Sequence, residues 1–80
     1  MDISRIRRFV IALLPELGFA PTEPNWETVL VSDGKPTGCR FEFDQVRAFW
    51  FAARQAIEFY GADWAPLKVA TVDTAANGGL

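Results

Sequence analysis

The sequence contains no histidine and only one cysteine, Cys39. Without histidine, the chain has no ordinary Ser-His or Cys-His pair to activate a nucleophile. A single thiol cannot form a disulfide within the chain, and without histidine it falls short of a zinc ligand set. We therefore expect no catalytic residue, no metal site and no cofactor, and we expect a non-enzymatic role.

Basic residues are also scarce. Eight lysines and arginines stand against ten acidic residues, which gives a formal net charge of −2 at pH 7. Nucleic-acid-binding domains usually carry a basic patch on a basic chain. The charge balance therefore disfavours RNA as a partner, although it leaves a local basic patch open.

Long hydrophobic runs are missing as well. The arginine-flanked apolar run at residues 9–14 is followed at once by Pro15 and Glu16. A secretory signal needs roughly 7–15 apolar residues and a transmembrane helix about 20. The sequence thus predicts no membrane association and a cytoplasmic location, which a single cysteine also suits.

Apolar residues are abundant instead. Half of the 80 residues are hydrophobic, including seven phenylalanines and three tryptophans. A chain of this length forms one small domain, which we place at residues 1–73. Without a disulfide or metal, its stability must come from apolar packing, to which self-association can add.

Residues 2–17 have the spacing of an amphipathic helix. Asp2 or Ser4 can cap its start, Pro15 should end or kink it, and Gly18 is a natural stop. Core packing explains this pattern, and a helix lying on a membrane surface is the alternative. The apolar positions that fall on one face are Ile3, Ile6, Phe9, Val10, Leu13, Leu14 and Leu17.

Residues 19–25 form a linker, because Pro21 and Pro24 interrupt both helices and central strands. Residues 26–73 then read as a β-meander that opens with a hairpin around the segment SDGKPTG. We expect a disordered tail at residues 74–80. The expected strands are 28–32, 38–43, 46–52, 56–60 and 67–72.

The segment at residues 45–60 allows two interpretations. Taken alone it is a good amphipathic helix, and a second helix there would give an α-β-β-α-β order. The regular spacing of the neighbouring strands favours two strands joined by a turn at residues 53–55, although that turn has no typical turn residue. We predict an α+β fold, with an N-terminal helix packed on a small antiparallel meander or barrel of about five strands.

The segment VLVSDGKPTGCRFEFDQ resembles the first motif of the Sm-like small β-barrel proteins. Its matching residues are Asp33, Gly34, Gly38, Phe43 and Asp44. The second motif is not matched, since Tyr60 precedes Gly61 where the family usually has a basic residue. The resemblance implies ring assembly through edge strands, and it makes an RNA-binding ring protein the alternative function.

The aromatic residues provide the remaining functional signal. In a strand, consecutive residues at 49–51 point to both faces of the sheet, and a single helix covers only one face. The other face would carry an exposed apolar patch, which usually marks an interface. We therefore expect an interaction module that forms homo-oligomers or binds another protein. The candidate surface consists of Phe49, Trp50, Phe51, Tyr60 and Trp64.

Overall fold

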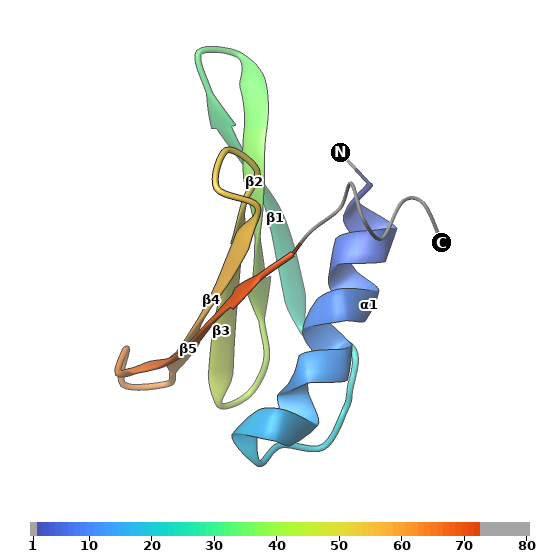
Figure 1. The fold of residues 1–80 in the computed structure, drawn as a ribbon, viewed down its shortest axis with the longest axis vertical. Helices are drawn as coiled ribbons and strands as arrows, with labels where there is room; N and C mark the ends of the chain where they lie inside the picture. Colours follow the sequence, from blue (N-terminus) through green and yellow to red (C-terminus); the bar gives the residue numbers. More distant parts are fainter. Residues whose placement is uncertain (1, 73–80) are drawn as a thin grey trace.

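The computed structural model of the chain describes residues 2–72. One N-terminal helix packs on a five-stranded antiparallel sheet, in which the strands lie side by side in chain order (Figure 1). This confirms the predicted α+β fold, but the sheet is open and does not close into a barrel. The elements are α1 (Ile3–Leu13), η1 (Leu14–Leu17), β1 (Trp26–Ser32), β2 (Lys35–Glu42), β3 (Val46–Phe51), β4 (Ala56–Gly61) and β5 (Pro66–Thr71).

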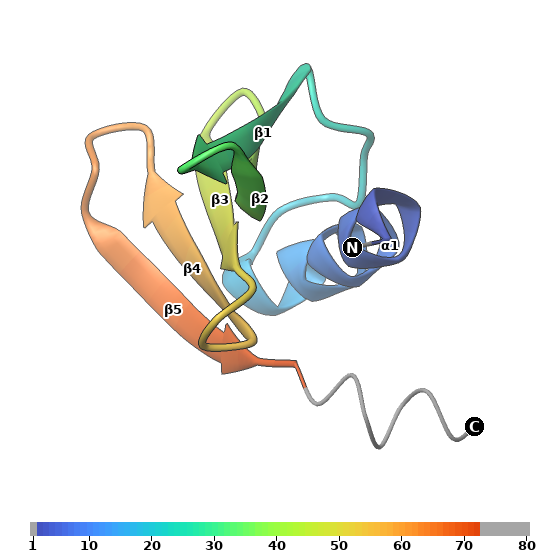
Figure 2. The ribbon, with the colours of Figure 1, turned by 90° about the horizontal axis from the view of Figure 1, so that it is seen from above.

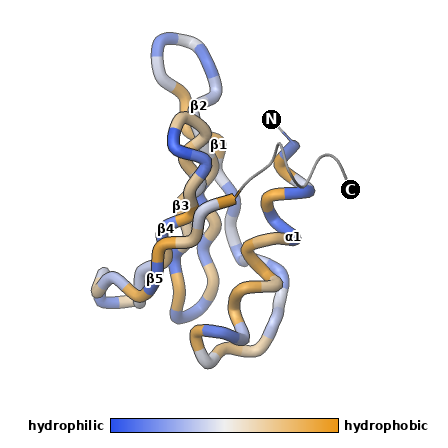
Figure 3. Tube along the Cα trace, in the orientation of Figure 1, coloured by the Kyte–Doolittle hydropathy of each residue, from blue (hydrophilic) through white to orange (hydrophobic). Residues whose placement is uncertain are grey.

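The N-terminal helix follows the predicted pattern. The Asp2 carboxylate accepts a hydrogen bond from the backbone N–H of Arg5 at 3.1 Å, which caps α1. Pro15 lies in the first turn of the 3₁₀ helix η1, and Gly18 ends it in the left-handed region at φ 90°. The predicted helix at residues 2–17 is therefore an α-helix followed by one 3₁₀ turn. Figure 3 shows the alternation of apolar and polar stretches along it.

Residues 45–60 form two strands, so the interpretation of this segment as a second helix was wrong. The loop between β3 and β4 spans residues 52–55, and Gln55 adopts a left-handed φ of 48°. Two backbone hydrogen bonds join this loop to residues outside it. The Ala52 N–H donates to the Thr37 carbonyl at 2.9 Å, and the Val72 N–H donates to the Gln55 carbonyl at 2.7 Å. These bonds from outside the loop stabilise a turn that lacks glycine, asparagine, aspartate and proline.

The first hairpin turns more tightly than predicted. Only Asp33 and Gly34 lie between β1 and β2, and both have positive φ angles, 53° and 76°. This geometry favours an Asp-Gly dipeptide, because both central residues of such a turn are left-handed. β2 therefore begins at Lys35 instead of residue 38. The register between β1 and β2 shifts after Leu30, which accommodates one additional residue in β2.

α1 covers one face of the sheet, and no described element covers the other (Figure 2). Side chains alternate between these two faces along β3 and β4. The apolar face of α1 is thus used by the core. The buried core comprises Ile6, Val10 and Leu14 from the helical segment and Cys39, Phe41, Phe43, Val46, Ala48, Trp50, Ile57, Phe59 and Val72 from the sheet side.

Candidate functional site

The uncovered face of the sheet carries a group of contacting aromatic rings, here called the outer aromatic cluster. Phe49 is at its centre, with ring centroids 6.2 Å from Phe51, 5.8 Å from Tyr60 and 6.0 Å from Trp64. Phe49 stacks nearly parallel on Phe51, at 9°, and meets Tyr60 edge to face, at 83°. Such arrangements are the favoured geometries for aromatic pairs. The structure thus brings together four of the five residues that we selected from the sequence.

Trp50 does not belong to this surface. Its side chain is only 4% exposed and lies in the core between the sheet and α1. Successive side chains of a strand point to opposite faces, so Trp50 cannot share a face with Phe49 and Phe51. Its inclusion in the candidate surface was wrong, and the remaining four aromatic residues define the site.

Trp64 reaches the cluster from the loop between β4 and β5. Its backbone has a φ of 66°, a left-handed conformation that is unfavourable for a bulky residue and costs of order 1–3 kcal/mol. Three hydrogen bonds close this loop. The Gly61 N–H donates to the Ala65 carbonyl and the Trp64 N–H donates to the Gly61 carbonyl, both at 2.9 Å. The Ala65 N–H donates to the Asp63 carboxylate at 3.0 Å. The loop therefore holds the indole in place while leaving it 49% exposed.

Two arginines, which the sequence analysis did not select, support the cluster. The Arg47 guanidinium lies 4.6 Å from the Trp64 ring centroid and donates to the Ala62 carbonyl at 2.8 Å. Arg40 lies 5.5 Å from the Phe49 centroid and 5.7 Å from that of Trp64. Both arginines pair with the single carboxylate of Glu42, at 3.2 Å for Arg40 and 3.6 Å for Arg47.

The sequence held a signal for one of these arginines. Arg40 alternates with the apolar residues Cys39 and Phe41, which places it on the opposite face of β2. Its aromatic neighbours could be identified only from the strand register, in which Arg40 lies directly across from Phe49. Arg47 likewise lies across from Tyr60 on β4.

The other end of the cluster holds a charged network around Glu58. The Tyr60 hydroxyl donates to one carboxylate oxygen, and Arg54 donates to the other at 2.7 Å. The Arg54 guanidinium also lies 4.5 Å from the Phe51 ring centroid. The hydrogen bonds from Tyr60 and then Arg54 lower the pKa of Glu58, and the bond to Glu58 raises the pKa of Tyr60. Glu58 and the four aromatic rings line a shallow open groove.

Replacing Glu58 with glutamine should lower the pKa of Tyr60 toward its ordinary value, because the hydroxyl loses its anionic acceptor. The chain has a single tyrosine, so tyrosinate absorbance titration reports this residue alone. In the wild type, the raised folded-state pKa means that the bond stabilises the fold below about pH 10, and this contribution disappears as the pH rises through that pKa.

Arg54→Gln is the matched control for that titration, because it leaves the Glu58 carboxylate beside Tyr60 while removing its other hydrogen-bond donor. This variant should retain a raised pKa for Tyr60. Identical titration midpoints in wild type and Glu58→Gln would contradict the hydrogen bond.

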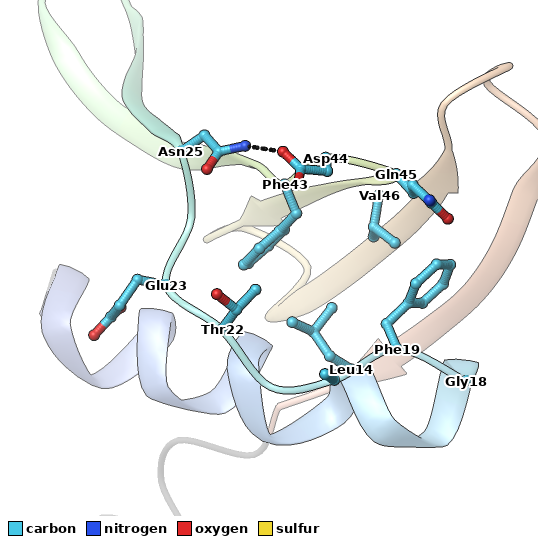
Figure 4. Close-up of a pocket in the computed structure, with 11 residues that line it drawn as sticks. Leu14, Gly18, Phe19, Thr22, Glu23, Asn25, Phe43, Asp44, Gln45 and Val46 are labelled. Atoms are coloured by element: carbon cyan, nitrogen blue, oxygen red, sulfur yellow. Dashed lines mark hydrogen bonds between the residues drawn. The ribbon is translucent and has the colours of Figure 1, made fainter.

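A second pocket lies between the linker and the turn after β2 (Figure 4). Leu14, Phe43 and Val46 form its apolar side, and the Asn25 side-chain amide donates to the Asp44 carboxylate at 2.6 Å across its rim. That bond ties the linker to the sheet, which gives Asp44 a structural role.

Outside the outer aromatic cluster, the thiol of Cys39 and the carboxylates have the chemistry of metal ligands. Cys39 is 1% exposed, and burial raises the pKa of its thiol, which disfavours the nucleophilic thiolate. Within residues 2–72, no three or more of the Cys, Asp and Glu side chains come together as a possible metal site. No helix in this part of the chain is long and apolar enough to cross a membrane.

Comparisons with known proteins found no matching family model, no matching curated protein and no matching solved structure. The resemblance to Sm-like proteins therefore stays a prediction, and the geometry of the site carries the functional argument.

Proposed function

We propose that this chain is a small cytoplasmic, non-enzymatic interaction module that self-associates through the outer aromatic cluster. The observation that carries the proposal is the state of Trp64, which is half exposed on a strained and closely bonded loop. Backbone strain at an exposed side chain favours a functional role, because stability alone would select a relaxed loop with glycine at this position.

The composition of the cluster also supports an interface. Tryptophan, tyrosine and arginine are the residue types that contribute most often to binding hot spots. Here Trp64 and Tyr60 lie together with ring centroids 6.1 Å apart, and Arg47 packs against Trp64. The rings contact one another in the isolated chain, so little side-chain entropy would be lost when a partner binds.

Replacing Trp64 with alanine should weaken self-association by about 30-fold or more, the effect of losing about 2 kcal/mol at a hot spot. Analytical ultracentrifugation across a concentration series would measure the change as a shift toward a lower average mass. Leu67→Ala is the control, because Leu67 is exposed to a similar degree (43%) on β5 but lies outside the cluster. Equal association of folded wild type and Trp64→Ala would contradict the proposal.

A second candidate function is binding of single-stranded RNA, as the Sm-like resemblance implies. Its support is the partly exposed cluster with Arg40 and Arg47 beside it, because unpaired bases stack on aromatic rings and guanidinium planes of this kind. Against it, both arginines already pair with Glu42. Filter binding of oligo-U and oligo-A at low salt would test this function, and salt-sensitive retention is its expected signature.

A further inference from the structure

The open sheet has two edges, β1 and β5, with no further strand beside either edge within residues 2–72. An edge strand presents unpaired backbone N–H and C=O groups that can pair with a strand of another chain. In the described part of the chain, the large hydrophobic residues that are exposed lie on these two strands or in the loop before β5. They are Trp26, Val29, Val31, Trp64, Leu67 and Val69.

The two edges differ in their protection against pairing. β5 begins at Pro66 and carries Lys68, and proline and lysine on an edge strand are the usual features that prevent edge-to-edge contact. β1 has neither residue over its seven positions. Its one charged residue, Glu27, forms an ion pair with Arg7 at 2.8 Å and so leaves no unpaired charge on this strand. Both edge pairs contain a register shift, so β1 is the less protected edge by its lack of proline and lysine.

We infer that β1 pairs antiparallel with β1 of a second copy of this chain, about a twofold axis at Val29. A twofold axis perpendicular to the sheet places the α1-covered faces of both copies on the same side of the joined sheet. Two residues that lie opposite each other across the axis must therefore have side chains on the same face. Val29 is the middle residue of Trp26–Ser32, and centring there satisfies that condition along the whole strand. This register places Thr28 opposite Leu30, Glu27 opposite Val31 and Trp26 opposite Ser32 of the second copy.

The length and charges of β1 suit pairing with a second copy better than those of β5. In the β1 register Glu27 faces a valine, so no like charges lie opposite each other. β5 has six residues, so pairing Pro66–Thr71 along its full length with β5 of a second copy leaves no residue on the twofold axis. Such pairing would place side chains from opposite faces of the sheet opposite each other. Centring the axis on Lys68 would place two lysines opposite each other, which is destabilising. Centring it on Val69 avoids this contact but pairs only residues 67–71, fewer than the seven of β1.

Pairing at β1 uses a surface different from the outer aromatic cluster. Val29 pairs with the buried Cys39 on the α1 side of the sheet, whereas Phe49 pairs with Arg40 on the other side. The two copies would form one continuous sheet, with both helices on one face and both aromatic clusters on the other. The inference therefore stands independently of the proposed function.

Thiol cross-linking of the full chain tests the pairing. Since Val29 lies across from Cys39, the assay uses a Cys39→Ala background, which prevents an intrachain disulfide. In this background Val29→Cys should oxidise to a covalent dimer. Paired strands raise the effective concentration of the two thiols into the millimolar range, so its yield should exceed that of Val69→Cys, on the other edge, by about tenfold.

Two further measurements make the test decisive. Adding Trp64→Ala should leave the cross-link intact, and losing it would assign the dimer to the aromatic cluster and overturn the inference. In the wild-type chain, amide hydrogen exchange in β1 should slow as protein concentration rises, while exchange in β5 should not. Equal cross-linking at Val29 and Val69, or β1 exchange that does not depend on concentration, would also overturn it.

Discussion

Replacing Phe59 with alanine should remove a large part of the free energy of unfolding of this chain. Phe59, a residue of β4, is fully buried in the core. Deleting a buried phenylalanine ring costs about 3–5 kcal/mol. Globular domains are stabilised by only about 0.05–0.15 kcal/mol per residue, or about 4–12 kcal/mol for an 80-residue chain, so this loss removes a large part of the total. Urea denaturation followed by circular dichroism would measure the loss.

Phe51→Ala is the matched control, because Phe51 lies on the outer face and remains partly exposed. It should cost about 1 kcal/mol, near the centre of the range for point substitutions in general. The comparison tests the assignment of the two sheet faces with the same chemical change. Comparable losses for Phe59→Ala and Phe51→Ala would show that this assignment is wrong.

Replacing Gly38 with alanine should have the second largest effect. A Cβ atom at this position would lie 2.0 Å from the backbone oxygen of Trp50 and 3.1 Å from its carbonyl carbon. Backbone atoms of a paired strand cannot rotate away, so β2 and β3 would have to separate locally. Overpacking of this kind costs about 1–3 kcal/mol or more.

Gly61→Ala is the control for that substitution. Its Cβ would meet the Asp63 side-chain oxygen at 3.0 Å and the Ala65 backbone oxygen at 3.9 Å, an ordinary van der Waals distance. A shift of a few tenths of an ångström at Asp63 relieves the closer contact, whereas no such shift is open to the backbone at Gly38. Thermal unfolding of both variants would measure the difference, with a clear drop in Tm expected for Gly38→Ala alone. Equal Tm values for Gly38→Ala and wild type would contradict the close approach of β2 and β3.

Association should be affected by Gly38→Ala as well. Gly38 lies across from Phe51, and the neighbouring Thr37 carbonyl accepts the Ala52 N–H that anchors the loop after β3. A displaced β3 would move two rings of the outer aromatic cluster, Phe49 and Phe51. The variant should thus lose self-association even at temperatures where it remains folded.

Much of the fold could be predicted because the relevant signals are local. The cap at Asp2, the three- and four-residue apolar spacing of α1 and the Asp33–Gly34 turn each act within a few residues. The alternation at Cys39 and Phe41 likewise identified the buried face of β2. Patterns of this kind determine which backbone conformations are favourable before any tertiary contact forms.

The candidate site was only partly predictable for the same reason. Alternation along β3 implies that Trp50 must face away from Phe49, yet the aromatic composition of the segment suggested one shared surface. The partners of Arg40 and Arg47 depend on the strand register and on the loop at residues 62–65, which are set by contacts between distant residues.

The sequence by itself determined that this chain forms an N-terminal helix and a hairpin in an α+β domain, with a large apolar core and no histidine-based chemistry. Only the tertiary structure decided that residues 52–55 form a turn, because its backbone bonds go to Thr37 and Val72. The tertiary structure also decided that Trp64 joins Phe49 and Tyr60 on the uncovered face. The physical reason is the separation of the interacting residues along the sequence. Local patterns set the conformation of each segment, whereas pairing between distant strands decides which side chains come into contact.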